Sequence, residues 1–311
     1  PPRYTDRSKE LLREQLFGLI DRDYNSPSVI AYSIYNEEWG IGHREDETAL
    51  WDDPEKQDAL ATLYEDVRDE DPTRLVCDNS GWAHVATDLN DYHEYFVLPD
   101  RADAWRDRLS TITGNPTQNY ADPRTDPEDA ATVISEFGTW GLPDAEALIE
   151  RAGGTPHWFD HDFLEGLARP AGVRERFAES HLSDAFDSLA ALADAWQTRE
   201  FRSIEPTIAD MRKEPDIDGY VITELTDIEW EFNGLLDHDR TEKSFVDELA
   251  RVNAPVFVDL EVLTPVAWEN QRVSIDLFVG NDSRTAKSVS VTVEAEGVEA
   301  RHEVSLEPTE T

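Results

Sequence analysis

The feature that most constrains the fold is the run Ser28–Tyr35 (SVIAYSIY), which is almost continuously apolar or β-favouring. The turn-forming residues Asn25, Ser26 and Pro27 stand directly before it. A strand that is buried on both faces reads as an unbroken apolar run, and such strands belong to parallel sheets covered by helices. The run therefore predicts a buried parallel strand of an α/β protein.

Segments with helical and strand-like patterns alternate around this run. Apolar residues at helical spacing, with Ser8 as a candidate N-cap, predict a first helix from about Ser8 to Arg22. Asp53 and Pro54 supply a cap and a first-turn proline for a second helix. Further strands are expected at 74–77, 87–92, 131–135 and 220–225, and a further helix is expected around 186–196. Residues 100–129 are expected to form a long irregular loop near the functional face of the protein.

After about Asn253 the pattern changes to the short alternating segments VFVDLEVL, RVSIDLFV and SVSVTVEAEG. Alternation of apolar and polar residues over such lengths is typical of strands with one buried face. We therefore expect an α/β domain over 1–252 and a small β-sandwich-like (immunoglobulin-like) domain, whole or in part, over 253–311.

The composition is strongly acidic, with 68 Asp and Glu against 28 Lys and Arg and a formal net charge of −40. Such a charge repels the phosphates of nucleic acid and argues against it as a partner. Salt screens the self-repulsion, because the Debye length falls from about 10 Å at 0.1 M to about 3 Å at 1 M. The composition favours the cytoplasm of a halophile or a brine. An ordinary acidic enzyme is the alternative, and secretion stays open because the chain begins at Pro1.

Cysteine and hydropathy patterns add two exclusions. Cys77 is the only cysteine, so an intrachain disulfide is excluded. No apolar run approaches the ~20 residues of a membrane-spanning helix, so no membrane contact is expected. A homo-oligomer is compatible with the sequence, which leaves the oligomeric state open.

Two apolar strands run directly into a carboxylate at the end where parallel α/β barrels carry their functional groups. Ser28–Tyr35 leads into Asn36 and Glu37, and the strand at 131–135 leads into Glu136. Burial and a neighbouring negative charge both raise the pKa of a carboxyl group at such a rim. A pair of this kind suits glycoside hydrolysis, in which one carboxyl group protonates the leaving oxygen and the other attacks the anomeric carbon.

Several segments then carry a resemblance to one family. SPSVIAYSIYNEEWG resembles the acid/base segment of glycoside hydrolase family 2, and SEFG is similar to the nucleophile segment of the same family. DPTRLVCDNSGW, DLNDYHEYF and DGYVITELTDIEWEFNGLLDHDR resemble further strands of a subgroup related to β-galactosidases and β-glucuronidases. The similarity covers roughly residues 8 to 250, and it implies strands four to eight of a (β/α)8 barrel.

The resemblance implies a role for individual residues. Glu37 is expected to be the general acid/base of a retaining β-glycoside hydrolase, and Glu136 its nucleophile. Asn36 is expected to bind the sugar 2-hydroxyl, and Tyr95 to hold the carboxylate of Glu136. For Asn36 and Tyr95 the alternative is a structural cap. His93 near the same rim is expected to contact substrate, with a solvated loop histidine as the alternative.

Other residues near these strand ends are candidates for sugar binding. Trp39 and Trp140 lie within four residues of the two carboxylates, where they can stack on a sugar or simply pack. Among the acidic residues in and after the last predicted strand, Glu224 or Asp227 is the better candidate for the floor of the pocket. Family members commonly carry Trp where this chain has Thr223, so the identity of the sugar stays open.

The resemblance also implies that three barrel strands and the preceding β-sandwich domains of the family are missing from this chain. The second hypothesis is consequently a non-catalytic carbohydrate-binding protein or a remnant of such an enzyme. A third is a metal-dependent hydrolase, for which His157 and His161 form the only close histidine pair. A loop or packing role explains that pair better, and we expect neither a metal nor another cofactor.

Overall fold

The computed structural model describes residues 4–42, 50–160, 165–262, 266, 268–269, 271–295 and 298–308. His161, one of the predicted histidine pair, lies outside the described residues. The chain divides into two compact units. The first comprises Pro1–Trp140 and Asp216–Gly234, and the second comprises Gly141–Pro215 and Leu235–Thr311.

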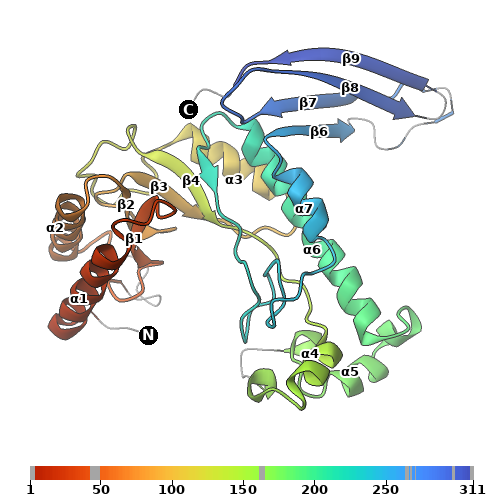
Figure 1. Cartoon of the computed structure of the whole chain (residues 1–311), viewed down its shortest axis with the longest axis horizontal. Coiled ribbons are helices and arrows are strands. Elements are labelled where there is room, and N and C mark those ends of the chain that lie inside the picture. The colour runs from red at the N-terminus through yellow and green to blue at the C-terminus, as the bar shows by residue number, and fades with distance from the viewer. Residues whose placement is uncertain are drawn as a thin grey trace. The chain divides into compact units, whose positions relative to one another are not determined.

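Parallel strands form the centre of the first unit (Figure 1). β1 (Ala31–Asn36) pairs with β2 (Leu75–Ser80), and β4 (Ala131–Glu136) pairs with β3 (Leu89–His93) on one side and β5 (Gly219–Tyr220) on the other. β2 also lies against β3. The predicted parallel α/β architecture is confirmed for this unit, and the predicted strands are all present, although β5 is much shorter than 220–225.

The described residues of the same unit form three helices: α1 (Asp6–Asp23), α2 (Pro54–Glu70) and α3 (Ala102–Gly114). α1 begins two residues earlier than expected. Its N-cap is Thr5, and Ser8 instead occupies the third helical position of a capping box with Thr5. The cap of α2 is as predicted, because the Asp53 side chain accepts hydrogen bonds from the backbone N–H groups of Glu55 and Lys56.

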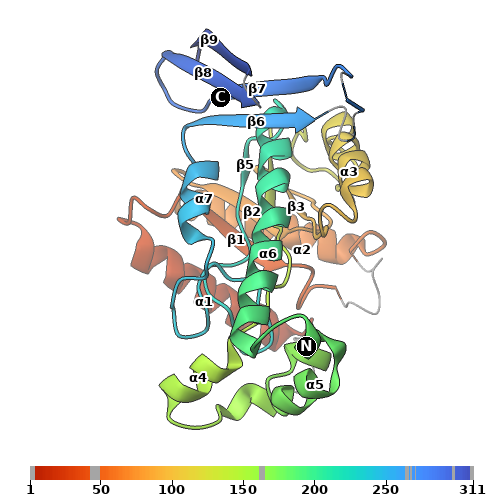
Figure 2. The same ribbon diagram turned by 90° about the vertical axis from the view of Figure 1, so that its right-hand side faces the viewer.

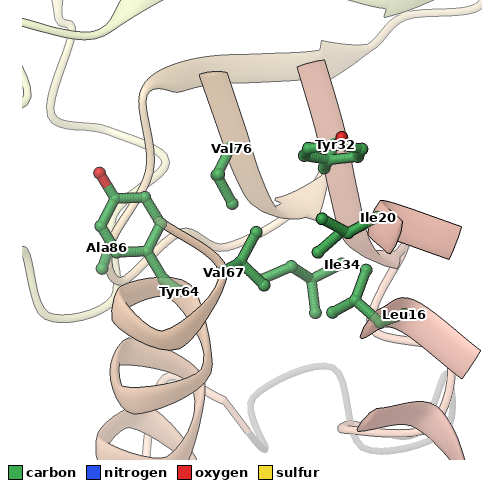
Figure 3. Close-up of a cluster of buried hydrophobic side chains, with 8 residues drawn as sticks. All are labelled: Leu16, Ile20, Tyr32, Ile34, Tyr64, Val67, Val76 and Ala86. Carbon is green, nitrogen blue, oxygen red and sulfur yellow. The ribbon is translucent and has the colours of Figure 1, made fainter. Parts of the chain in front are cut away.

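A hydrophobic core joins α1 and α2 to the sheet (Figure 3). Leu16 and Ile20 of α1 and Val67 of α2 point toward Ile34 of β1 and Val76 of β2. Ile20, Val67 and Val76 are fully buried. This packing fixes the direction of β1 and β2, and with it the place where the chain leaves them.

The prediction of a continuous loop over 100–129 is wrong, because α3 lies within it. Trp105, Leu109 and Ile112 recur at helical spacing and are buried. The many charged residues of this segment give it the composition of a loop. The helical spacing of its apolar residues nevertheless indicates a helix with one apolar face.

The second unit contains four α-helices and two antiparallel strand pairs among its described residues (Figure 2). α6 is the longest helix, and α7 lies beside it. The buried Lys243 ammonium pairs with the buried Glu200 carboxylate of α6 at 3.1 Å. The elements are α4 (Ala145–Ala152), α5 (Val173–Glu179), α6 (Leu189–Lys213), α7 (Val246–Val252), β6 (Val256–Val262), β7 (Ile275–Asn281), β8 (Lys287–Ala295) and β9 (Val298–Leu306), with 3-10 turns at 157–160, 166–168 and 181–184.

The strand segments expected after Asn253 are thus present as β6–β7 and β8–β9, and β9 adds a strand that the sequence reading had not identified. Their arrangement as a β-sandwich domain over 253–311 stays a prediction. None of the helices in the described part of the chain has the length and apolar character needed to cross a membrane.

Candidate active site

Four neighbouring parallel strands end at the same edge of the first unit, and each ends in a polar residue. In the strand register Asn36 of β1 lies opposite Ser80 of β2, and His93 of β3 lies opposite Glu136 of β4. Because parallel strands all point the same way, these residues gather at one rim. The two carboxylates predicted from the sequence are therefore brought to the same end of the sheet.

A sharp turn places Glu37 at this rim. Glu37 and Glu38 have left-handed backbone angles, with φ of 50° and 60°. Their backbone N–H groups donate to the Ser80 carbonyl at 3.0 Å and to the Asn79 side-chain oxygen at 3.0 Å. Left-handed conformations are unfavourable for residues with a side chain, so these bonds from β2 hold a strained turn.

His93 lies between the two carboxylates. Its Nδ1 is 3.0 Å from Oε1 of Glu37 and 3.3 Å from Oε2 of Glu136. One oxygen of each carboxylate and one ring nitrogen all lie within 4.8 Å of one another. The His93 side chain is 3% exposed, whereas those of Glu37 and Glu136 are 23% and 26% exposed. The histidine thus lies beneath the carboxylates, and it does not line the cleft as expected for a substrate contact.

Tyr95 is the second partner of Glu136. The Tyr95 hydroxyl donates a hydrogen bond of 2.7 Å to Oε2 of Glu136. Burial and the negative charge of Glu136 raise the pKa of Tyr95 well above its usual value, so the hydroxyl keeps its hydrogen. A charge-assisted bond of this length fixes the orientation of the carboxylate.

The hydrogen bond from His93 lowers the pKa of Glu37, while burial acts in the opposite direction. A hydrogen bond from the Trp39 indole N–H, 3.3 Å from Oε2 of Glu37, lowers it further. The predicted Trp39 therefore touches the carboxylate directly.

A cleft of about 650 Å³ opens above the rim. It is lined by residues of the first unit, and of the predicted site residues Asn36, Glu37, Trp39, Tyr95, Glu136, Trp140 and Glu224 are among them. Trp39, Tyr95 and Trp140 are all about 40% exposed, which leaves their ring faces available to a ligand. Asp227 is buried and is not among the residues that line the cleft, and it accepts a hydrogen bond from the Gly234 backbone.

Sequence reasoning missed several residues of this region, three of which bear on the two carboxylates and His93. Glu231 lines the cleft, and burial together with the charges of Glu136 and Glu37 raises its pKa. No local pattern distinguishes it from its acidic neighbours. Ser80 and Asp91 lie below His93, and the spacing of two between Asp91 and His93 on one strand was a signal that both face the same way.

Glu37, His93 and Glu136 also form a donor set that could hold a divalent ion, as could the buried group Cys77, Asp78 and His84. In the second group the Asp78 carboxylate already accepts hydrogen bonds from His84 Nδ1, at 2.7 Å, and from two backbone N–H groups. Hydrogen bonding therefore accounts for Asp78 without an ion.

The model of the family 2 glycosyl hydrolase TIM barrel domain matches residues 5–150, which hold β1 to β4 and both rim carboxylates. These residues belong to glycosyl hydrolase family 2. The family expected from the sequence is thereby confirmed, and so is the TIM-barrel class of this segment. The assignment of the strands as four to eight of a barrel stays a prediction. No curated protein matches the chain.

Two solved structures are similar to the chain, and the first of them shares its fold. A β-D-mannosidase from Dictyoglomus thermophilum aligns with 98% of this chain and 36% of its own, at 15% identity and a TM-score of 0.55. An FMN-binding β-glucuronidase from Facaelibacterium prausnitzii L2-6 aligns with 99% of this chain and 45% of its own, at 15% identity and a TM-score of 0.46. The chain thus spans less than half the length of either enzyme.

Proposed function

We propose that the protein is a retaining β-glycoside hydrolase that cleaves O-glycosidic bonds by double displacement, with Glu37 as general acid/base and Glu136 as nucleophile. The observation that carries the proposal is the approach of the two carboxylates, an oxygen of each lying within 4.8 Å of the other. Carboxyl groups about 5 to 5.5 Å apart are typical of retaining glycosidases, whereas inverting enzymes need about 6.5 to 9.5 Å to admit a water.

In the first step Oε of Glu136 bonds to the anomeric carbon while Glu37 gives a proton to the departing glycosidic oxygen. The bond from Tyr95 keeps the Glu136 carboxylate in line for this attack. In the second step a water bonds to the anomeric carbon and releases Glu136, and Glu37 takes a proton from that water. Both the aglycone alcohol and the free sugar leave, and each carboxyl group returns to its starting state.

The charge of the cleft bears on the substrate. Glu37, Glu136, Glu224 and Glu231 line it, and among the described lining residues there is neither lysine nor arginine. An anionic sugar would meet like charges without a counterion, which costs several kcal/mol in a partly buried site. A neutral hexoside such as a β-galactoside or β-mannoside therefore fits better than a β-glucuronide.

The test compares Glu136→Ala and Glu37→Ala in the full-length gene product, with nitrophenyl and alkyl glycosides of the same sugar. Glu136→Ala should lose turnover on both, because no glycosyl intermediate can form. Glu37→Ala should lose the alkyl glycoside but still release nitrophenolate, which departs without a proton. Azide should then restore its turnover and give a β-glycosyl azide.

Glu150→Ala, which removes a carboxylate distant in sequence from the rim, is the matched control and should behave as the wild type. An α-glycosyl azide would refute the retaining mechanism, and equal behaviour of the two variants would refute the assigned roles. Binding of sugar without turnover in the wild type would favour the second hypothesis, a carbohydrate-binding protein.

A further inference from the structure

A turn at the end of β1 holds Trp39 against the acid. The Trp39 backbone N–H donates to the Asn36 carbonyl at 2.9 Å and closes the turn in which Glu37 and Glu38 have left-handed angles. The Trp39 indole N–H donates to Oε2 of Glu37 at 3.3 Å. Trp39 lines the cleft and is 40% exposed. One turn therefore sets the positions of both the Glu37 carboxylate and the Trp39 ring.

The two oxygens of Glu37 face different neighbours. Oε1 lies 3.0 Å from His93 Nδ1, and the same nitrogen lies 3.3 Å from Oε2 of Glu136. Oε2 of Glu37 instead accepts the hydrogen bond from Trp39. The contacts of Glu37 therefore run from the side of the nucleophile, at Oε1, to the Trp39 ring, at Oε2.

The order of these groups fixes where the two parts of a glycoside lie. The anomeric carbon must reach the carboxylate of Glu136, and the glycosidic oxygen must lie about 2.6 to 3.2 Å from Glu37 to take its proton. In a displacement the nucleophile and the leaving group occupy opposite sides of the anomeric carbon. The leaving group thus extends past Glu37 and away from Glu136, and Trp39 lies on that side of the acid.

We propose that Trp39 is a specificity-determining residue whose ring supports the leaving group, and that the leaving group is therefore cyclic, as in a second sugar or another ring alcohol. The indole ring offers a large flat apolar face, on which the C–H face of such a ring stacks. An acyclic alcohol leaves most of that face in water. The inference rests on the proposed function and adds to it the class of group that is cleaved off.

The other exposed aromatic residues of the cleft have different neighbours. The Tyr95 hydroxyl is bonded to Glu136, which places this ring beside the sugar that becomes attached to the nucleophile. Trp140 packs edge-on against Phe232, with 6.2 Å between the ring centroids. Of these three aromatic side chains, all of which the structure describes, Trp39 alone is hydrogen-bonded to the acid.

The first test uses the full-length protein and the neutral sugar whose nitrophenyl glycoside it hydrolyses fastest. It compares the cyclohexyl with the isopropyl glycoside of that sugar. Both alcohols are secondary and similarly acidic, so both need the proton from Glu37 to the same degree. The wild type should favour the cyclohexyl glycoside in kcat/KM by about 3- to 10-fold, through the additional apolar surface that the ring covers. Trp39→Ala should remove this preference.

Trp39→Phe separates the ring from the indole N–H. It removes the donor to Glu37, which should lower kcat/KM for both glycosides alike, but it keeps an aromatic face and should keep most of the preference. Trp51→Ala is the matched control, because Trp51 is 41% exposed in the same unit and is not among the described residues that line the cleft. It should retain the wild-type preference. An unchanged preference in Trp39→Ala, or an equal loss in Trp51→Ala, would overturn the inference.

The second test follows the same contact in the direction of synthesis. A nitrophenyl glycoside forms the glycosyl intermediate, and cyclohexanol and isopropanol at equal concentration compete for it. The alcohol oxygen bonds to the anomeric carbon, the bond to Glu136 breaks, and Glu37 takes the proton of the alcohol. The ratio of cyclohexyl to isopropyl glycoside should fall in Trp39→Ala by the factor found in the first test, since synthesis and hydrolysis pass through the same transition state. A merely structural defect slows both products alike, and the unchanged ratio would overturn the inference.

The outcomes distinguish this inference from the proposed function. Hydrolysis of both alkyl glycosides, with a preference that does not depend on Trp39, refutes the role of Trp39 and leaves the glycosidase intact. If the full-length protein hydrolyses no nitrophenyl glycoside, the proposed function fails, and the inference that rests on it fails as well.

Discussion

Replacement of Gly81 by alanine should disable the site through His93. Gly81 follows β2 with a φ of +78°, and a Cβ built there would lie 2.2 Å from the nearest atom of the His93 ring, whereas ordinary contact begins at 3.4 Å. The ring must therefore retreat by about 1.2 Å, the difference between these two distances. The bonds of 3.0 Å to Ser80 and Glu37 cannot survive a retreat of that size.

Two magnitudes follow for Gly81→Ala. A displacement of about 1 Å at a catalytic constellation costs on the order of 10²-fold in turnover. The left-handed backbone adds about 1 to 2 kcal/mol of destabilisation for a residue with a Cβ. Steady-state kinetics of the full-length protein measure the first quantity, and urea unfolding of the chain measures the second.

Gly18→Ala is the matched control, because apart from the adjoining backbone of α1 nothing lies within 4 Å of a Cβ built at Gly18. It should keep wild-type turnover and raise the free energy of unfolding by about 0.5 to 1 kcal/mol. Wild-type turnover in Gly81→Ala, together with an unshifted NMR signal from the His93 ring, would refute the reasoning.

Four further predictions concern catalysis and stability. Tyr95→Phe removes the donor to Glu136 and should lower kcat on the order of 10- to 100-fold, since a hydrogen bond to a charged group contributes about 1.5 to 3 kcal/mol; an unchanged kcat would show that Tyr95 does not orient the nucleophile. Burial alone would raise the pKa of Asp71, but hydrogen bonds from Thr73, Tyr32 and Arg74 lower it to about 2. The stabilisation from Asp71 is therefore complete above the unfolded value near 3.8 and is lost as the pH falls toward 2, so the difference in unfolding free energy between wild type and Asp71→Asn should shrink over that range. The melting temperature should rise between low salt and molar KCl as self-repulsion is screened, and a flat response would remove the argument from charge. Prolonged treatment with EDTA should leave turnover unchanged, and a loss restored by one divalent ion would instead indicate a metal at the Glu37–His93–Glu136 group.

The sequence predicted the two carboxylates because each follows an apolar strand, and that arrangement needs only local pattern and the direction of parallel strands. It was harder to predict the arrangement of Ser80, Asp91 and His93. These residues lie on strands whose polar sequence resembles that of a loop, and only the neighbouring strands of the fold bury them. Glu231 could not be found from pattern, since it comes from a segment without regular structure that reaches the cleft only through the tertiary fold. The helix α3 was not predicted for a different reason. The polar composition of residues 100–129 suggested a loop, although the helical spacing of their apolar residues indicates a helix.

Among the described strands, β1 forms hydrogen bonds with β2 alone, and its other edge is not paired with any described strand. At low ionic strength the net charge of −40 keeps two copies of the chain apart. Salt that stabilises the fold also removes this barrier to association. The yield of folded monomer should therefore first rise with the salt concentration, as the fold is stabilised, and then fall, as copies of the chain associate. Purification of this chain needs a salt concentration just below the one that gives the highest yield.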